Sequence, residues 1–587
     1  MTHSLKRYWI LLSSYLQPQW PSVLLLAVLL LGQIGLQLVN PQIIRRFIDM
    51  VGTGRSLEEL ANAALLFIGL AVAGQLLALG AVAVGENVAW TATNALRFDL
   101  TLHCLKLDMS FHKAHAPGEL IERIDGDVNA LANFFSQMAI HLIASALLAA
   151  GILVLLFREN WRTGAIGFGY ALLTVTILSA VQKSVTKAWA DSRQAEAEWV
   201  GFTGERLAGT EDIRASGAES FVMSQYYRLM RNISRAWLKA KTVQASSANA
   251  GAAVYLFTQI AILAVGAWLF LRDQMTIGTV YLAIHYVGQL KGPLDTIRRQ
   301  VDDLQRASAN IERVEALLNT RSPMVENPRA ELPGGPLAVA FDRVCFQYND
   351  TLQTDMASSA LQEVTFKLHP GQVLGLLGRT GSGKTTLTRL LFRLYDPTQG
   401  KISLDGIDLV DTGLSDLRQR IGLVTQDVQL FRASVRDNLT LFNKRFSDEQ
   451  LLNAFRELEL GEWVQSLPQG LDTMLQTGGK SLSAGQAQLL AFARVLLQDP
   501  GLVILDEASS RLDPATEQLL ERAISRLLDK RTAIIVAHRL STVQRADQIM
   551  ILGKGRIIEY GQRAALANDP NSHFYNLLRT GMGEALA

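Results

Sequence analysis

The sequence predicts a membrane domain made only of helices, over residues 1–320, followed by an α/β domain over residues 337–587. Two observations carry this prediction. The first part contains six long stretches without a charged residue, and the second part alternates short apolar strands with helices around a glycine-rich loop. Residues 321–336, rich in proline and glycine, are the predicted linker.

The composition agrees with a chain that lies partly in a bilayer. Apolar residues make up 49% and charged residues 19% of the 587 residues, and the charged share is below the roughly 25% usual for soluble proteins. This apolar content excludes a disordered chain. Two cysteines are too few for a disulfide scaffold, and a net charge of +2 gives no support for a nucleic-acid partner.

The uncharged stretches have the length of membrane spans. A hydrocarbon core of about 30 Å requires about 20 helical residues. Five stretches reach that length, and the sixth is slightly short and is expected to continue past Lys291. The stretches are residues 22–44, 61–85, 128–157, 163–182, 243–271 and 274–290. Buried helices of a soluble protein and a cleaved signal peptide are the disfavoured alternatives, because six such runs exceed a water-soluble core and the first run is too long for a signal.

The basic residues indicate the orientation of the spans. Six spans place both termini on one side, and the segments on that side hold 16 Lys and Arg residues against 6 in the opposite connections. Basic residues concentrate on the cytoplasmic side of membrane proteins. The sequence therefore predicts a multi-pass protein of the inner (plasma) membrane, embedded in the lipid bilayer, with both termini and the α/β domain in the cytoplasm.

The two long cytoplasmic connections are predicted to be helical, because few Pro or Gly residues interrupt residues 86–113 and 183–208. Spans two to five are then expected to continue beyond the membrane as helices. Each pair ends in a short turn, one at residues 116–118 and one at residues 209–210. These tips are either solvated turns or points of contact with another domain.

A phosphate-binding loop opens the α/β domain. The segment from Gly378 to Thr385 fits G-x-x-x-x-G-K-[ST], after an apolar strand at 373–377 and before a helix at 385–394. Glycines let backbone amides surround a phosphate, while Lys384 adds a charge at the β- and γ-phosphates and Thr385 offers a hydroxyl to Mg²⁺. The candidate ATP-binding residues here are Gly378, Arg379, Thr380, Gly381, Ser382, Gly383, Lys384, Thr385 and Thr386.

Two carboxylates follow a second buried strand, residues 502–505. Asp506 is expected to reach Mg²⁺, and Glu507 is placed to polarise a water that attacks the γ-phosphate. Phosphoryl transfer depends on such positioning and charge neutralisation. A further buried strand is predicted at 533–536, and a helix is predicted at 487–497, with Ser483 and Gly485 at its beginning.

The chain resembles the ATP-binding-cassette (ABC) family. Residues 482–486, Leu-Ser-Ala-Gly-Gln, are similar to its signature motif and lie 23 positions before Asp506. The resemblance implies that Tyr348 stacks on adenine, that Gln426 joins Mg²⁺ to the membrane domain, that Asp513 belongs to the D-loop and that His538 contacts the γ-phosphate. It implies these functional groups: catalytic Glu507, His538 and Gln426; metal-binding Thr385, Gln426 and Asp506; and Ser483, Ala484, Gly485 and Gln486, which contact ATP held by another cassette.

The resemblance extends into the membrane half. Residues 111–128 and 209–215 look like the two intracellular loops of ABC exporters. Six spans and one cassette form the half-transporter arrangement of the exporter (type IV) fold, in which the α/β domain is an ABC ATPase of the P-loop class. The resemblance implies that ATP is held between two cassettes, so a second half-transporter is an expected partner.

Three departures from the family pattern bear on that partner. Ala484 replaces a glycine of the signature, Arg511 replaces a small D-loop residue, and residues 488–490 differ from the common pattern. Such features resemble chains that pair with a different half-transporter. A homodimer and a heterodimer are therefore equally expected.

The expected function is ATP-driven transport, with export of an amphipathic or hydrophobic molecule as the first hypothesis. An importer of a chelated metal or metabolite and an ATP-gated regulator without net pumping stay open as alternatives. The uncharged runs contain no acidic residue, which disfavours proton coupling. Candidate substrate contacts, each equally explained by helix packing, are Gln33, Gln37, Trp268, Tyr281, His285 and Gln289.

Overall fold

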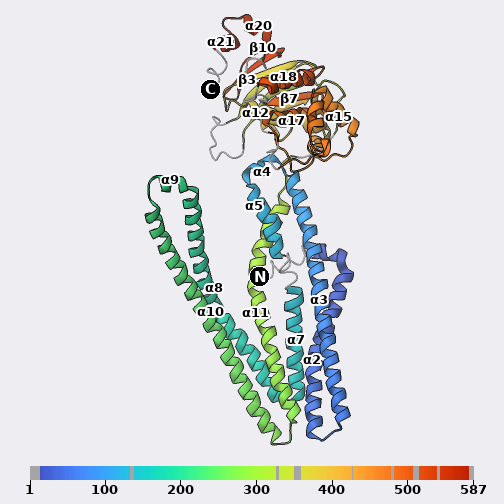
Figure 1. Cartoon of the computed structure of the whole chain (residues 1–587), viewed down its shortest axis with the longest axis vertical. Coiled ribbons are helices and arrows are strands. Elements are labelled where there is room, and N and C mark those ends of the chain that lie inside the picture. The colour runs from blue at the N-terminus through green and yellow to red at the C-terminus, as the bar shows by residue number, and fades with distance from the viewer. Residues whose placement is uncertain are drawn as a thin grey trace. The chain divides into compact units, whose positions relative to one another are not determined.

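The computed structural model describes residues 13–131, 138–324, 329–348, 359–425, 428–476, 482–506, 514–537 and 543–580. The chain divides into two compact units (Figure 1). The first comprises Met1–Leu105 and Gly118–Thr320 and is helical. The second comprises Lys106–Pro117 and Arg321–Ala587 and contains all the strands of the described chain. The predicted class, a helical domain followed by an α/β domain, is confirmed.

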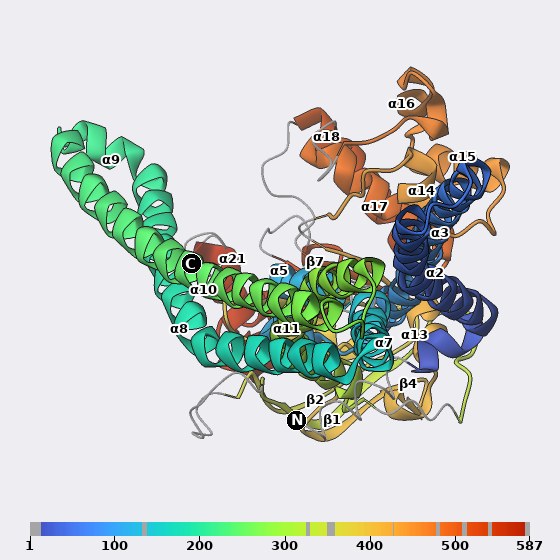
Figure 2. The ribbon, with the colours of Figure 1, turned by 90° about the horizontal axis from the view of Figure 1, so that it is seen from below.

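The first unit consists mainly of long helices. They are α2 (Trp20–Gly52), α3 (Leu57–Lys106), α7 (Ala144–Glu159), α8 (Trp161–Ala208), α10 (Glu219–Phe270) and α11 (Ile277–Asn319). At 1.5 Å per residue, the 52 residues of α10 extend about 78 Å, more than twice the hydrocarbon core of a bilayer. The long helices therefore extend well beyond a membrane, as predicted. α8 and α10 pack along each other and diverge from the remaining helices of the unit (Figure 2).

Five helical segments of the described chain are long and apolar enough to cross a membrane. They are Ser13–Gly52, Leu57–Lys106, His141–Glu159, Trp161–Ala208 and Glu219–Phe270. α11, which holds the sixth predicted span, is not among them, because His285, Gln289 and Lys291 interrupt its apolar first half. The count of six spans remains a prediction.

α11 is nevertheless packed as an internal helix of the first unit. The Tyr286 side chain is fully buried, and its hydroxyl donates to the carbonyl oxygen of Leu38 at 2.7 Å. The Gln42 amide donates to the same hydroxyl at 3.1 Å. These bonds fix the first half of α11 against α2, so that polar residues on the two helices lie close together.

Short helices occupy the predicted tips. α4 (Met109–Ala114) and α5 (Pro117–Ile121) flank the first turn, and α9 (Thr210–Ala215) follows the second. Asp108 caps α4 by accepting from the Ser110 amide at 3.1 Å. α4 belongs to the second compact unit, whereas α9 stays with the first and buries none of its residues.

The second unit contains a six-stranded sheet of order β10-β9-β3-β8-β7-β6 and a four-stranded sheet of order β2-β1-β4-β5. Its strands are β1 (Val339–Phe346), β2 (Leu361–Leu368), β3 (Val373–Gly378), β4 (Gln399–Leu404), β5 (Ile407–Asp408), β6 (Ile421–Val424), β7 (Leu502–Asp506), β8 (Thr532–Val536), β9 (Gln548–Gly553) and β10 (Arg556–Gln562). Strands β3, β6, β7, β8 and β9 are parallel, and β10 is antiparallel at one edge. Parallel strands end at one edge of a sheet, so the residues after β3, β6, β7 and β8 share that edge.

Helices complete this unit. They are α12 (Lys384–Leu391), α13 (Leu414–Arg420), α14 (Val435–Thr440), α15 (Asp448–Glu457), α16 (Gly461–Ser466), α17 (Ala484–Gln498), α18 (Pro514–Leu528), α20 (Arg563–Asn568) and α21 (His573–Thr580). The helix predicted at 385–394 ends at Leu391, before Arg393, whose φ of 45° is left-handed. Residues 329–336 of the predicted linker form hydrogen bonds with the same unit. For example, Arg420 donates to the carbonyl oxygens of Pro333 and Gly335, each at 2.7 Å.

Candidate nucleotide-binding site

The loop between β3 and α12 has the shape of an anion cradle. Gly378 and Gly383 have φ values of 149° and 106°, in the region that favours glycine. A Cβ atom on Gly378 would lie 2.3 Å from the carbonyl oxygen of Leu552, and one on Gly383 would lie 2.7 Å from that of Ala360. Only glycine fits at these two positions, so the backbone stays open to a bound group.

The start of α12 is suited to a phosphate. Gly383 is its N-cap residue and supplies no side-chain hydrogen bond to the first turn. The amides of a helix N-terminus carry partial positive charge and bind anions. Thr385 lies exposed in the first turn, where its hydroxyl can serve as an Mg²⁺ ligand, and Thr386 is buried beside it. The loop residues Arg379, Thr380 and Gly381 are also exposed.

Two buried polar groups face this loop. Lys384 is only 6% exposed. Its ammonium group donates to the carbonyl oxygen of Gly378 and to that of Arg379, the latter at 3.1 Å. The Ser382 residue is 4% exposed, and its hydroxyl has no hydrogen-bond partner. A buried hydroxyl without a partner is costly, and a phosphate oxygen would satisfy it. The cradle, the uncapped helix and this hydroxyl all fit a nucleotide phosphate.

Tyr348 lies against the first turn of α12. Its hydroxyl is 3.2 Å from that of Thr386 on α12, and its ring makes edge contacts with Phe346 and Tyr395 at centroid distances of 4.8 and 5.3 Å. The Lys113 ammonium group of α4 lies 4.5 Å from the ring centroid of Tyr348. The first tip thus contacts the aromatic residue that is predicted to stack on adenine. This agrees with the interpretation of the tips as points of contact.

Asp506 ends β7, two strands from β3 across β8. Two strand spacings amount to about 10 Å, so the carboxylate ends at the same edge of the sheet as the phosphate loop, at about that distance from it. Among the described residues, no group of three or more His, Cys, Asp or Glu side chains is placed to hold a metal ion.

Four predicted site residues, Gln426, Glu507, Asp513 and His538, lie outside the described residues. Their neighbours show where the chain leads to them. Gln426 comes two residues after β6, Glu507 directly after β7, and His538 two residues after β8. The roles assigned to the four residues stay predictions.

The signature segment starts a helix earlier than expected. α17 begins at Ala484, not at 487, because Ser483 and Gln486 form a capping box. The Ser483 hydroxyl accepts from the Gln486 amide at 3.2 Å, and the Gln486 side chain accepts from the Ser483 amide at 3.0 Å. Ser483 and Ala484 are exposed, while Gly485 is buried. The cap uses only the acceptor capacity of the hydroxyl, so its proton can be donated to an anion.

Arg494 was not singled out from the sequence. It lies on α17 and donates to the carbonyl oxygen of Asn438 at 2.6 Å and to that of Gln429 at 3.2 Å. Burial lowers the pKa of its guanidinium group to about 10. Arg494 therefore ties the signature helix to the segment that follows Gln426.

Comparisons with known proteins agree with this geometry. The family described as ABC transporter matches residues 361–510, and the ABC transporter transmembrane region matches residues 23–294. An uncharacterized ABC transporter ATP-binding protein, YknV of Bacillus subtilis, is 30% identical over 565 residues, covering 94% of this chain and 91% of its own. An ATP-dependent lipid A-core flippase of Chromobacterium violaceum is 30% identical over 577 residues, covering 96% of each chain. The structure of a bacterial Atm1-family ABC exporter with ATP bound shares the fold, with a TM-score of 0.75 at 24% identity, over 96% of this chain and 97% of that one.

Proposed function

Since this chain belongs to the ABC transporter family, we propose that it works as one half of a dimeric ATP-driven exporter of amphipathic or hydrophobic molecules. The observation that carries the proposal is the phosphate loop, with its buried Lys384 and orphaned Ser382 hydroxyl, in the same chain as helices long enough to cross a bilayer. ATP hydrolysis coupled to transport is the activity that this combination supports.

Each residue of the loop has a defined task in ATP binding. The amides of α12 and the Lys384 ammonium group neutralise the β- and γ-phosphates, which requires Lys384 to exchange its loop carbonyls for phosphate oxygens. Tyr348, immobilised by Thr386, offers a ring face to adenine. Thr385 and Asp506 are the described residues that would hold Mg²⁺, whose charge offsets that of the phosphates.

The hydrolytic step is assigned to residues that follow the strand ends. Glu507 accepts a proton from the attacking water, His538 contacts the γ-phosphate, and Gln426 reports the state of the site to the membrane domain. The capping box supports the assignment of Ser483 to ATP on another cassette, because its hydroxyl proton is available at the exposed end of α17.

The need for two half-sites supports a dimer of half-transporters. A phosphate loop and a signature helix in one chain supply parts of two sites, and a second half-transporter supplies the rest. The partner is either the same chain or a different one. The relatives include proteins called lipid A-core flippases and a fatty acid ABC transporter of Mycobacterium bovis, which supports a lipid-like substrate for an exporter in the inner membrane with its cassettes in the cytoplasm.

The ATPase rate of the purified full-length protein in lipid nanodiscs tests the proposal. Wild type is expected to hydrolyse ATP, and Lys384→Ala is expected to lose at least tenfold in kcat/KM, because a charge-assisted contact with phosphate is worth about 1.5–3 kcal/mol. Lys401→Ala, which removes an exposed lysine of β4 outside the predicted nucleotide site, is the matched control and should retain the rate. Wild-type protein that binds ATP without hydrolysing it, alone or with a partner half-transporter, would instead indicate an ATP-gated regulator.

A further inference from the structure

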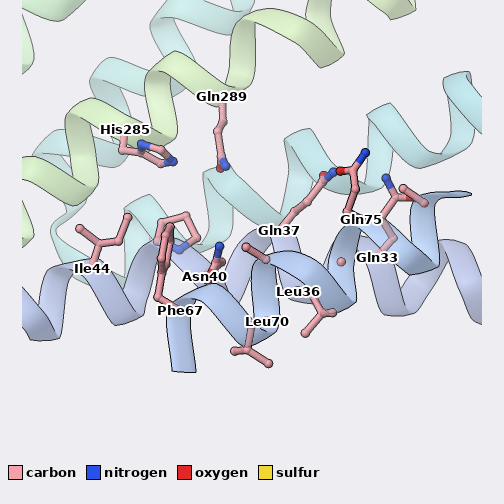
Figure 3. A pocket seen from close by; sticks show the side chains of 14 residues that line it. Gln33, Leu36, Gln37, Asn40, Ile44, Phe67, Leu70, Gln75, His285 and Gln289 are labelled. Atoms are coloured by element: carbon pink, nitrogen blue, oxygen red, sulfur yellow. The ribbon is translucent and has the colours of Figure 1, made fainter. Parts of the chain in front are cut away.

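A cavity of about 240 Å³ lies inside the membrane unit, between α2, α3 and α11 (Figure 3). Fourteen residues line it. On α2 the lining positions 33, 37, 40 and 44 follow the spacing of one helix face, and on α11 the positions 285 and 289 do the same. His285 and Gln289 extend from α11 toward the side occupied by α2 and α3 (Figure 3).

Uncharged hydrogen-bonding side chains converge on this cavity from all three helices. They are Gln33, Gln37, Asn40, Gln75, His285 and Gln289. All fourteen lining residues are described, and none of them is Asp, Glu, Lys or Arg. Five carboxamides at one membrane cavity indicate a binding role, because polar side chains inside a membrane are expensive and mark substrate pathways.

Several acceptors in the cavity lack a donor. The side-chain carbonyl oxygens of Asn40 and Gln289 are buried and have no hydrogen-bond partner. Pro41 also lines the cavity, and its nitrogen carries no hydrogen for the backbone carbonyl of Gln37 one turn earlier. Buried acceptors without donors are unfavourable in a membrane, so a ligand that brings hydroxyl or amide hydrogens is stabilised here.

The remaining wall is apolar. Leu36, Ile44, Phe67 and Leu70 line the same cavity, beside the amides. The volume of about 240 Å³ is below the roughly 300–1,000 Å³ of pockets that enclose a drug-sized ligand, so it holds a head group with the first part of a chain.

We propose that this cavity binds the uncharged, hydroxyl- or amide-bearing head group of the transported amphiphile, whose donors meet Asn40 and Gln289. A charged head group is selected against, since no lining side chain carries an opposite permanent charge and an unpaired ion is expensive to bury. This inference rests on the proposed function and assigns the substrate class of the exporter.

The test uses the full-length dimer in nanodiscs without ATP. The probe is decyl glucoside with a photoreactive diazirine in its alkyl chain, and binding is the cross-linking to α2, α3 and α11 that unlabelled decyl glucoside competes away. Decyl sulfate and decyltrimethylammonium have the same chain with a negative or positive head group. The expected result is that they compete at least tenfold more weakly than decyl glucoside. Equal competition by the three amphiphiles would overturn the proposal. This comparison uses wild-type protein alone, so it does not depend on the folding of a variant.

Two near-isosteric variants test the named residues. Asn40→Leu and Gln289→Met are each expected to weaken competition by decyl glucoside about tenfold, the effect of losing one hydrogen bond to the ligand. Gln259→Met is the matched control. The Gln259 side-chain oxygen is also buried without a partner, but Gln259 does not line the cavity, and its amide nitrogen donates to Tyr255 and to the carbonyl oxygen of Ile284. Wild-type competition in both cavity variants would contradict the assignment.

The outcome is separable from that of the proposed function. Basal ATPase activity of the same preparations reports on the cassettes, and retention of that activity shows that a variant is folded. Intact ATPase activity with no preference for the glucoside would refute only the head-group proposal. Absent wild-type ATPase activity would refute the proposed function, whatever the probe does.

Discussion

Replacing Ser483 by alanine separates a structural role from a nucleotide-binding role, because the chain contains a second capping box of the same composition. Ser447 and Gln450 cap α15 with bonds of 3.3 and 2.9 Å, and Ser483 and Gln486 cap α17 with bonds of 3.2 and 3.0 Å. Both serines are exposed. Ser447 belongs to none of the nucleotide motifs, so Ser447→Ala is a matched control.

The two substitutions should cost the same stability. Loss of a serine N-cap costs about 1 kcal/mol, which lowers the melting temperature of a domain of this size by about 2–4 °C. Only Ser483→Ala also removes a hydroxyl that is proposed to donate to a γ-phosphate. A hydrogen bond to a charged group contributes about 1.5–3 kcal/mol, so kcat/KM for ATP should fall about 10- to 150-fold.

The assay compares melting curves and ATPase kinetics of the two variants in nanodiscs. Equal melting shifts, with a large loss of kcat/KM for Ser483→Ala alone, are expected. If both variants lose the same modest fraction of activity, Ser483 acts only as a cap, and the reasoning that pairs a signature helix with the ATP of another cassette is wrong.

Three further results are expected. Gly383→Ala should abolish ATP binding measured by nucleotide fluorescence, since its Cβ would meet a carbonyl oxygen at 2.7 Å. Gly381→Ala adds only the strain of a φ of 78°, because its Cβ meets no atom within 4 Å, and should retain part of the binding; equal loss would contradict the steric account. Arg494→Met should lower the free energy of unfolding by about 2–4 kcal/mol, because two partly buried carbonyls lose their donor, and an unchanged melting curve would rule this out. Hydrogen bonding to Arg436 lowers the pKa of Asp448 below its ordinary 3.8, so the pair stabilises the folded state above that pH and no longer does so once the pH falls through the lowered pKa. Asp448→Asn should therefore reduce the difference in melting temperature between neutral and acid pH. An identical difference in the variant would refute this pH dependence.

The sequence predicted those parts of the site that are contiguous in the chain. The phosphate loop was identified because its glycines, Lys384 and flanking strand lie within a dozen residues. The start of α17 was misplaced because the Ser483–Gln486 capping box was overlooked, although its spacing is visible in the sequence. The contact of Lys113 with Tyr348 joins segments 235 positions apart, and no local pattern indicates it.

The residues of the membrane cavity were also predicted only in part, because they come from helices far apart in the sequence. Gln33, Gln37, His285 and Gln289 were named as polar residues of the spans, and the structure brings all four to one cavity. Asn40 was missed although it lies one turn from Gln37 on the same face.

Two other named residues do not line the cavity. The guanidinium carbons of Arg162 and Arg272 lie 5.2 and 4.1 Å from the ring centroid of Trp268. The Tyr281 ring stacks on that of His285. Tertiary packing decides which polar residues share a space, and a single sequence does not show how helices rotate against one another.

The central claim is tested most directly by accumulation of radiolabelled decyl glucoside in inside-out vesicles that contain the full-length dimer. ATP-dependent accumulation by wild type, lost in Glu507→Gln while ATP binding is retained, is the predicted result. Accumulation that needs no ATP, or that persists unchanged in Glu507→Gln, would contradict an exporter driven by hydrolysis at this site.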